Sequence, residues 1–456
     1  MEFLSQDYLL ENEPARILYE KVSNLPIVDL HNHGDVKEIV ENENYDDIWQ
    51  VEAATDHYVW ELMRRRGISE EYITGSASNK EKWFALAEVF PEFIGNPTYE
   101  WVHLDLKRRF GIDRTISSYN AEYIWDKTAR LLSRDEMKPR SLLKEMNVEI
   151  MCTTDNPVSE LEYHEMAQSK LDWIDILPTW RPDQAMNIGD DVWNDFQEKL
   201  SGRFNRSLES FDEFLQALED THDYFAEFGC VATDHGLFEP VSYETEKKQV
   251  SNIYEKALNG ETLSPSEVKD FKSYMLMFFG ELNREKDWNM QLHIGAMRDY
   301  RDSLFETLGA DSGGDICTHN IDIAENLKYF LNAFDSELDI VIYYLDPSHL
   351  PAMATIARAF PNVEIGAPWW FNDSSYGMKE HLKLVSTYDL LANQAGMVTD
   401  SRKLMSYDSR TEVFRRTLCS VVGEFVDTGR APLEASSDLV KDLCYNKPLG
   451  RFQLQM

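Results

Sequence analysis

The sequence lacks the features that would point to disulfide bonds, membrane spans or nucleotide binding. Its five cysteines are an odd number, stand far apart and include no Cys-x-x-Cys pair, so we expect neither a disulfide framework nor a cysteine-based zinc site. No apolar run approaches the roughly eighteen residues of a membrane span. The glycine-rich nucleotide-binding motifs and Gly-x-Ser-x-Gly are also absent, which disfavours nucleotide-dependent enzymes and serine hydrolases.

Positive charge is scarce as well. The chain carries 45 Lys and Arg residues against 81 Asp and Glu residues, a net charge of −36. Because this field repels nucleic acid and anionic membranes, we expect neither as a partner, and an anionic substrate would need local arginines in its pocket. The cysteine usage, together with an acidic N-terminal segment that lacks the order of a signal peptide, predicts a cytoplasmic protein.

The sequence does contain short apolar stretches that alternate with helical ones. Eight of them read as strands, at residues 26–33, 148–155, 173–180, 229–236, 290–295, 338–344, 363–370 and 395–401. Strands that alternate with helices predict a parallel sheet, and eight of them predict an α/β fold of the (β/α)8 TIM-barrel type.

The first two predicted strands are separated by more sequence than an ordinary crossover needs. Residues 38–145 look mostly helical, with amphipathic stretches at 56–66 and 121–132. We therefore expect a distorted barrel that forms a single domain over residues 1–456, with 38–145 as a helical insertion. Further along the chain, the capping box Ser264-Pro265-Ser266-Glu267 predicts a helix that reaches roughly Arg284.

Two histidines, His31 and His33, end the first predicted strand. Alternate side chains of a strand point to the same face, so the two imidazoles should converge on one point. Neutral imidazole is the commonest protein ligand for zinc and similar ions. The pair therefore predicts half of a metal site, although two unrelated loop histidines would give the same pattern.

Other ionisable residues gather where the remaining predicted strands end, which is where barrels of this type carry their active sites. They include Arg181, Asp234, His235, His293, Asp400 and Arg402. We expect His31, His33, His293 and Asp400 to bind one divalent metal ion, with zinc favoured and manganese, iron or nickel possible. His235 is a reserve ligand or a substrate-binding residue, and Asp234, which precedes it, would point elsewhere if the strand continues. No lysine ends the fourth strand, so a carbamylated lysine bridging two ions is not expected.

These residues resemble the amidohydrolase superfamily, and longer motifs narrow the resemblance to uronate isomerase, also called glucuronate isomerase. The matching motifs run in order along nearly the whole chain: Asp56-His57-Tyr58-Val59-Trp60, Ile94-Gly95-Asn96-Pro97, Trp101-Val102-His103-Leu104, Thr153-Thr154-Asp155, Trp180-Arg181-Pro182-Asp183, Gln291-Leu292-His293-Ile294-Gly295-Ala296, Trp369-Trp370-Phe371-Asn372-Asp373 and Gly396-Met397-Val398-Thr399-Asp400-Ser401-Arg402. The sequence departs from the family pattern at Gly34-Asp35-Val36, after His293-Ile294-Gly295-Ala296, and at Tyr343-Tyr344-Leu345-Asp346-Pro347. These departures bear on the shape of the sugar pocket.

The resemblance implies an aldose–ketose isomerase that acts on D-glucuronate, D-galacturonate or both, and that forms a homo-oligomer. Asp400 would then carry the proton between C2 and C1, besides its part as a metal ligand, and Arg402 would stabilise the enediolate. Arg181 would bind the substrate carboxylate. Tyr58 would act as an acid on the aldehyde oxygen. The sugar would also contact His57, Trp369 and Trp370, of which at least one tryptophan is expected to belong to the core.

Two other functions remain open at this point. A metal-dependent amide or lactone hydrolase on the same barrel would use the same ligands and yield no ketose. A non-catalytic sugar-acid-binding protein would bind a hexuronate without turnover and would tolerate substitution of Asp400.

Overall fold

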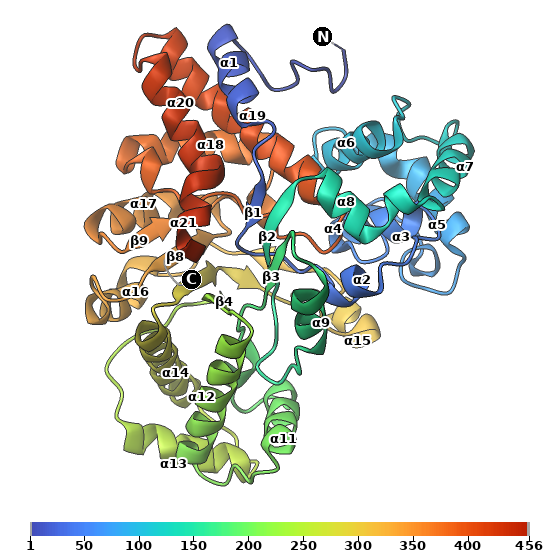
Figure 1. The fold of residues 1–456 in the computed structure, drawn as a ribbon. Coiled ribbons are helices and arrows are strands. Elements are labelled where there is room, and N and C mark those ends of the chain that lie inside the picture. Colours follow the sequence, from blue (N-terminus) through green and yellow to red (C-terminus); the bar gives the residue numbers. More distant parts are fainter. Residues whose placement is uncertain (1, 454–456) are drawn as a thin grey trace.

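The computed structural model describes residues 2–453, and its strands pair mostly in parallel at the centre of the molecule, with helices around them (Figure 1). One parallel sheet has the order β1-β2-β3 and another the order β4-β5-β8-β9, while β6 and β7 form a small antiparallel pair. The strands are β1 Ile27–Asp29, β2 Val148–Cys152, β3 Asp175–Leu177, β4 Ala232–Leu237, β5 Asn289–Ile294, β6 Ala296–Met297, β7 Ile316–Cys317, β8 Ile340–Tyr344 and β9 Val363–Ile365. The predicted α/β class is confirmed.

Isolated contacts join these sheets edge to edge. A parallel bridge between Trp180 and Thr233 links the first sheet to the second, and another bridge runs from β9 to the segment 394–401. Within that segment, Asp400 donates its backbone N–H to the carbonyl oxygen of His31 at 3.1 Å. The eight segments thus follow one another in the order that a (β/α)8 barrel has, although the sheet is interrupted. The eighth predicted strand does not form a regular strand, because its backbone makes only scattered hydrogen bonds to its neighbours, such as those of Ala395 N–H to Ile365 and His33 N–H to Ser401.

Seven α-helices lie between β1 and β2 and group together on one side of the strands (Figure 1). They are α2 Val36–Glu41, α3 Ile48–Glu52, α4 His57–Arg65, α5 Asn79–Val89, α6 Pro97–Phe110, α7 Ala121–Leu132 and α8 Pro139–Glu145. An apolar cluster that includes Trp49, Trp83 and Phe90 lies within this group and continues to β2 and β3. The helical character predicted for this stretch is therefore confirmed.

Helices from the rest of the chain cover the other sides of the strands. They are α1 Glu13–Val22, α9 Glu162–Lys170, α10 Asp183–Met186, α11 Asp191–Phe204, α12 Phe211–Glu227, α13 Lys247–Leu258, α14 Pro265–Lys286, α15 Asp302–Leu308, α16 Ile323–Ala333, α17 Leu350–Ala359, α18 Ser375–Tyr388, α19 Ser406–Asp427, α20 Leu433–Lys441 and α21 Lys447–Gln453. The side chain of Ser264 caps α14, and Glu267 completes the predicted capping box.

The first helix of the chain packs against α19, a long and almost wholly buried helix that directly follows the segment carrying Asp400 (Figure 1). The two helices touch at Gly423, where a Cβ atom would lie 2.8 Å from the Cα of Ala15. Only glycine allows this close approach of the two backbones. The packing fixes α19, and thereby the polypeptide that leads into it. None of the helices in the described part of the chain is long and apolar enough to span a membrane.

Candidate metal centre and active site

His31 and His33 both point their Nε2 atoms at one carboxylate oxygen. Asp400 Oδ1 lies 3.3 Å from His31 Nε2 and 3.2 Å from His33 Nε2. The histidines follow β1, and Asp400 adopts a left-handed backbone conformation with φ of 48°. Non-glycine residues in that region are uncommon and cluster at functional sites. The predicted meeting of the His-x-His pair with this distant carboxylate is therefore present in the fold.

The charges in this group favour an ionised carboxylate. Burial alone would raise the pKa of Asp400, but its contacts with His31 and His33 hold that pKa well below the usual range. Burial lowers the pKa of His33 to about 4, so its ring is neutral near pH 7. The side chain of His33 is 24% exposed, whereas that of His31 is only 2% exposed. The group is thus accessible from the side of His33.

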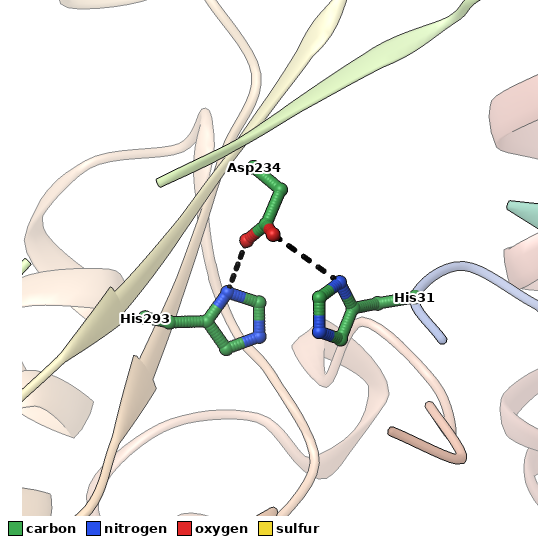
Figure 2. A group of neighbouring side chains, drawn as sticks. All are labelled: His31, Asp234 and His293. Carbon is green, nitrogen blue, oxygen red and sulfur yellow. Dashed lines mark hydrogen bonds and ion pairs between the residues drawn. The ribbon is translucent and has the colours of Figure 1, made fainter. Parts of the chain in front are cut away.

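His31 also belongs to a second, deeper group (Figure 2). Its Nδ1 atom lies 3.6 Å from Asp234 Oδ2, and the other oxygen of Asp234 accepts a hydrogen bond from His293 Nδ1 at 2.6 Å. All three side chains are at most 2% exposed. Burial alone would raise the pKa of Asp234, but Arg181 and the two histidines keep it well below its usual range. Asp234 is therefore a buried anion that orients both imidazoles.

The predicted four-residue metal shell is divided between these groups. Among residues 2–453, the sets able to hold a metal ion are His31 with His33 and Asp400, and His31 with Asp234 and His293, each with ligand atoms within 4.8 Å of one another. His293 thus lies beside Asp234 rather than beside Asp400, because it belongs to β5, next to β4. Asp234 was not predicted here.

The donors fit a divalent ion such as zinc. Imidazole nitrogens combined with a carboxylate oxygen are typical zinc ligands. His31 Nδ1 and His293 Nε2 are buried and have no hydrogen-bond partner within the described chain. Such unsatisfied buried atoms are rare in folded proteins unless a ligand or ion uses them or holds their neighbours in place.

Asp234, not His235, faces His31 and His293, and the expectation for His235 was wrong. His235 points to the opposite face of β4, where its Nε2 lies 2.8 Å from Thr233 Oγ1 and its ring stacks on Phe279 of α14. Successive side chains of a strand point to opposite faces, so placing Asp234 inside puts His235 outside.

Arg181 reaches the site but is already engaged by carboxylates. Its Nη1 lies 3.1 Å from Asp234 Oδ2, and its Nε donates to Asp183 Oδ2 at 2.7 Å. Burial alone would lower the pKa of Arg181, but these two carboxylates raise it. The guanidinium therefore neutralises buried negative charge, and these two nitrogens are not free to bind a substrate carboxylate.

The helical insertion delivers two side chains to the site from the first turn of α4. Tyr58 donates a hydrogen bond to Asp400 Oδ2 at 3.3 Å. Burial, together with the charge of Asp400, raises the pKa of Tyr58 well above its usual value, so the phenol stays protonated. His57 is buried beside it, and burial lowers the pKa of His57 to about 4. The insertion thus places a protonated phenol and a neutral imidazole at the site.

Both predicted tryptophans lie close to these residues. The Nε1 of Trp369 donates to the carbonyl oxygen of Tyr344 at 2.9 Å, and its ring meets His293 edge-on at a centroid distance of 4.6 Å. Trp370 meets His57 edge-on at 5.6 Å. Both tryptophan side chains are almost fully buried.

Arg402 lies at the outer edge of the site. Its Nη2 is 3.4 Å from Asp311, and its positive charge contributes to the lowered pKa of His57. Arg298, which was not predicted as a site residue, lies over the ring of Trp370 at 5.3 Å. Two arginines therefore border the site on the side of His57 and Trp370.

A buried ion pair beside Tyr58 was not predicted from the sequence. Arg410 of α19 donates to Asp373 at 3.1 Å and to the carbonyl oxygen of Thr399 at 2.8 Å, and it lies 5.2 Å from the centre of the Tyr58 ring. Asp373 stands in the quoted motif Trp369-Trp370-Phe371-Asn372-Asp373, but nothing in that motif indicates that its partner is an arginine in a later helix.

Comparison with known proteins identifies close relatives of the whole chain. A family model described as glucuronate isomerase matches residues 1–452. A protein named uronate isomerase from Thermotoga petrophila is 58% identical over 450 residues, which cover 99% of each chain.

Solved structures agree with this result. The crystal structure of a uronate isomerase from Thermotoga maritima superposes with a TM-score of 0.97 at 57% identity, covering 99% of this chain and 100% of that one. A glucuronate isomerase from Caulobacter crescentus has a TM-score of 0.95 at 24% identity, covering 99% of this chain and 97% of that one. The second match, at its low identity, shows that the two proteins share a fold.

Proposed function

This chain belongs to the glucuronate isomerase family and is a uronate isomerase, and on that premise we propose that it interconverts D-glucuronate with D-fructuronate, D-galacturonate with D-tagaturonate, or both pairs. Each reaction moves one hydrogen from C2 to C1 of the open-chain sugar. It therefore requires a base near C2, an acid near the aldehyde oxygen and a pocket that holds an anion.

The observation that carries the proposal is the way Asp400 divides its two oxygens. Oδ1 faces the two Nε2 atoms of His31 and His33, and Oδ2 faces the phenol of Tyr58. One carboxylate can thus serve as a metal ligand through Oδ1 and as a base through Oδ2. Its depressed pKa supports this role, because a base must be ionised before it can take a proton.

In the proposed reaction, Oδ2 of Asp400 takes the C2 proton of the open-chain aldose. The electron pair of the broken C–H bond forms the C1–C2 double bond, and the aldehyde oxygen takes the phenolic proton of Tyr58. The resulting enediol returns its O2 proton to Tyr58 as the C2 carbonyl forms, and C1 receives the proton from Asp400. General acid–base catalysis of this kind contributes about 10²–10⁴-fold.

We propose that the metal ion is held by His31, His33 and Asp400. This group is accessible from the side of His33, and a catalytic metal needs an open position. Asp234 and His293, which are fully enclosed, then orient His31 from behind. When bound, zinc or a similar ion would polarise and orient an oxygen of the sugar.

The remaining predicted residues are assigned to the sugar. His57 is a hydrogen-bonding group for a hydroxyl, Trp369 and Trp370 form apolar walls, and Arg402 stabilises the negative charge that develops on the aldehyde oxygen before Tyr58 protonates it. Arg181 has a different role from the predicted one, since its contacts support neutralisation of Asp234. The single-domain boundaries, the homo-oligomer and the cytoplasmic location stay predictions.

The test is an activity assay on the purified protein. We expect ketose to form from D-glucuronate, D-galacturonate or both, and activity to fall after chelation and return when zinc is added. Absence of ketose with either sugar would contradict the proposal. Two assays distinguish this function from hydrolysis. In D2O, an isomerase can exchange the proton taken from C2 for deuterium. A hydrolase instead converts an amide or lactone substrate to an acid and forms no ketose. Binding of a uronate without turnover would identify a sugar-acid-binding protein instead.

A further inference from the structure

We propose that Lys403 is a positioning residue for the reaction: its buried ammonium ties the first turn of α4 to the segment that carries Asp400, so that Tyr58 is held at the base. This inference rests on the function proposed above. Lys403 follows Asp400 by three residues and touches neither the proposed metal ligands nor the tyrosine.

Lys403 spans the boundary between the helical insertion and the segment that leads into α19. Its Nζ lies 2.9 Å from Glu52 Oε2, 2.9 Å from the carbonyl oxygen of Glu52, and 3.2 Å from Asp56 Oδ2. All three side chains are buried. A single ammonium group therefore holds the end of α3 and the residue that precedes α4.

Asp56 connects Lys403 to the backbone of Tyr58. Its Oδ1 caps α4 by accepting the backbone N–H of Tyr58 at 3.0 Å, while its Oδ2 faces Lys403. An N-cap side chain fixes the start of a helix, and Tyr58 is the second residue of α4. The position of the Tyr58 backbone is thus set by a carboxylate that Lys403 holds.

The contacts form a closed circuit. The chain runs from Asp400 to Lys403, the side chain of Lys403 reaches Asp56, Asp56 caps Tyr58, and Tyr58 donates to Asp400 Oδ2. A weaker hydrogen bond from Thr55 Oγ1 to the carbonyl oxygen of Arg402, at 3.4 Å, runs alongside. The base and the acid of the proposed reaction are therefore fixed to each other through Lys403.

Stability alone is a poor explanation for this arrangement. Burying an ammonium and carboxylates removes their hydration, and a well-packed apolar cluster of the same volume is often as stable or more stable. Asp105 lies in the same cluster, and burial raises its pKa well above the usual value. The cluster nevertheless provides directional contacts that an apolar cluster lacks, and placing a catalytic side chain requires direction.

The first test is Asp56→Asn. Asparagine is also a good N-cap, so α4 keeps its cap, but an amide replaces the charge that holds Lys403. We expect kcat to fall roughly 10- to 100-fold with little change in KM, because misplacing a reacting group costs rate more than affinity. The matched control is Asp47→Asn, since Asp47 caps α3 through Oδ1 and accepts from Asn79 through Oδ2. This control should keep the wild-type kcat.

A double-mutant cycle with Tyr58→Phe separates positioning from general support of the fold. If Asp56 acts through Tyr58, then Asp56→Asn should lower kcat in the wild type and have almost no further effect on kcat in Tyr58→Phe. An equal fall in both backgrounds would indicate a merely structural role and overturn the inference. The same double-mutant cycle can be measured with Lys403→Met in place of Asp56→Asn.

The possible failures are distinguishable. If the wild-type protein makes no ketose, the proposed function fails. If Tyr58→Phe keeps the wild-type kcat, the tyrosine has no catalytic role, and both that assignment and this inference fall. If Tyr58→Phe is impaired but Asp56→Asn has the wild-type kcat, only the positioning role of Lys403 is overturned.

Discussion

The phenol of Tyr58 lies 3.3 Å from the Oδ2 of Asp400, although the two residues are 342 positions apart in the chain. One comes from the helical insertion and the other from the segment that closes on β1. The pair brings a protonated phenol next to an ionised carboxylate, an arrangement suited to moving protons on a sugar.

Replacement of Asp400 by Asn should abolish turnover and leave the fold intact. An amide cannot take the C2 proton, so kcat should fall by at least about 10²–10⁴-fold. Ketose formation and far-UV circular dichroism are the measurements, with Asp408→Asn in α19 as the control of the same chemical change. A variant with near-normal kcat would remove Asp400 from the role of base.

Loss of a metal ligand should be visible without any activity measurement. We expect His33→Ala to lower the bound zinc per chain and to remove most of the rise in Tm that zinc gives the wild type, because an ion that binds only the folded state stabilises it. His319, an exposed histidine, provides the control His319→Ala. Full zinc content in His33→Ala, measured by elemental analysis, would contradict the assignment.

The substitution Arg181→Met tests whether this guanidinium serves the substrate or the fold. It leaves Asp234 buried without its cationic partner, so we expect the free energy of unfolding to fall by about 3–5 kcal/mol. Binding of a uronate and of a neutral sugar of similar size should then weaken equally. A selective loss of uronate binding at unchanged stability would restore the substrate-binding role predicted from the sequence.

Stability should depend on pH through His103, which lies away from the site. Its Nδ1 is 2.7 Å from the carbonyl oxygen of Tyr99, and its Nε2 accepts the N–H of Ile116 at 2.9 Å, so the folded protein requires the neutral ring. Burial lowers the pKa of His103 to about 4, whereas the unfolded chain titrates near 6.5.

Between these two values the unfolded state binds more protons than the folded state, so the free energy of unfolding rises with pH there. The contribution of His103 should be complete above about pH 6.5 and should fall by about 3 kcal/mol as the pH drops to about 4. Urea unfolding of wild type and His103→Gln at several pH values measures it. Identical pH profiles for the two proteins would refute the prediction.

The placements that were predicted correctly depend mainly on local patterns. Strand alternation predicted that His31 and His33 share a face, and although β1 ends at Asp29 both Nε2 atoms do meet at Asp400. The capping box at Ser264 starts its helix through contacts within four residues. Asp400 was predicted to lie beside the histidines because the ends of parallel strands meet at one end of the fold.

The errors have a different origin. Alternation along β4 shows that Asp234 and His235 face opposite ways, but it does not show which of them faces inward. That choice depends on the pairing of β4 with β5, which brings Asp234 against His293. In the same way, nothing near Arg181 in the sequence indicates that Asp234 already occupies one of its nitrogens.

The amino-acid sequence by itself determined the α/β class, the family and the meeting of Asp400 with the two histidines, since each depends on periodicity or on motifs within a few residues. Tertiary structure alone decided that Asp234 faces His31 and His293, that His31 contacts two carboxylates, and that α4 brings Tyr58 to Asp400. Those contacts join residues that are far apart in the chain, and their geometry is set by how whole strands and helices pack.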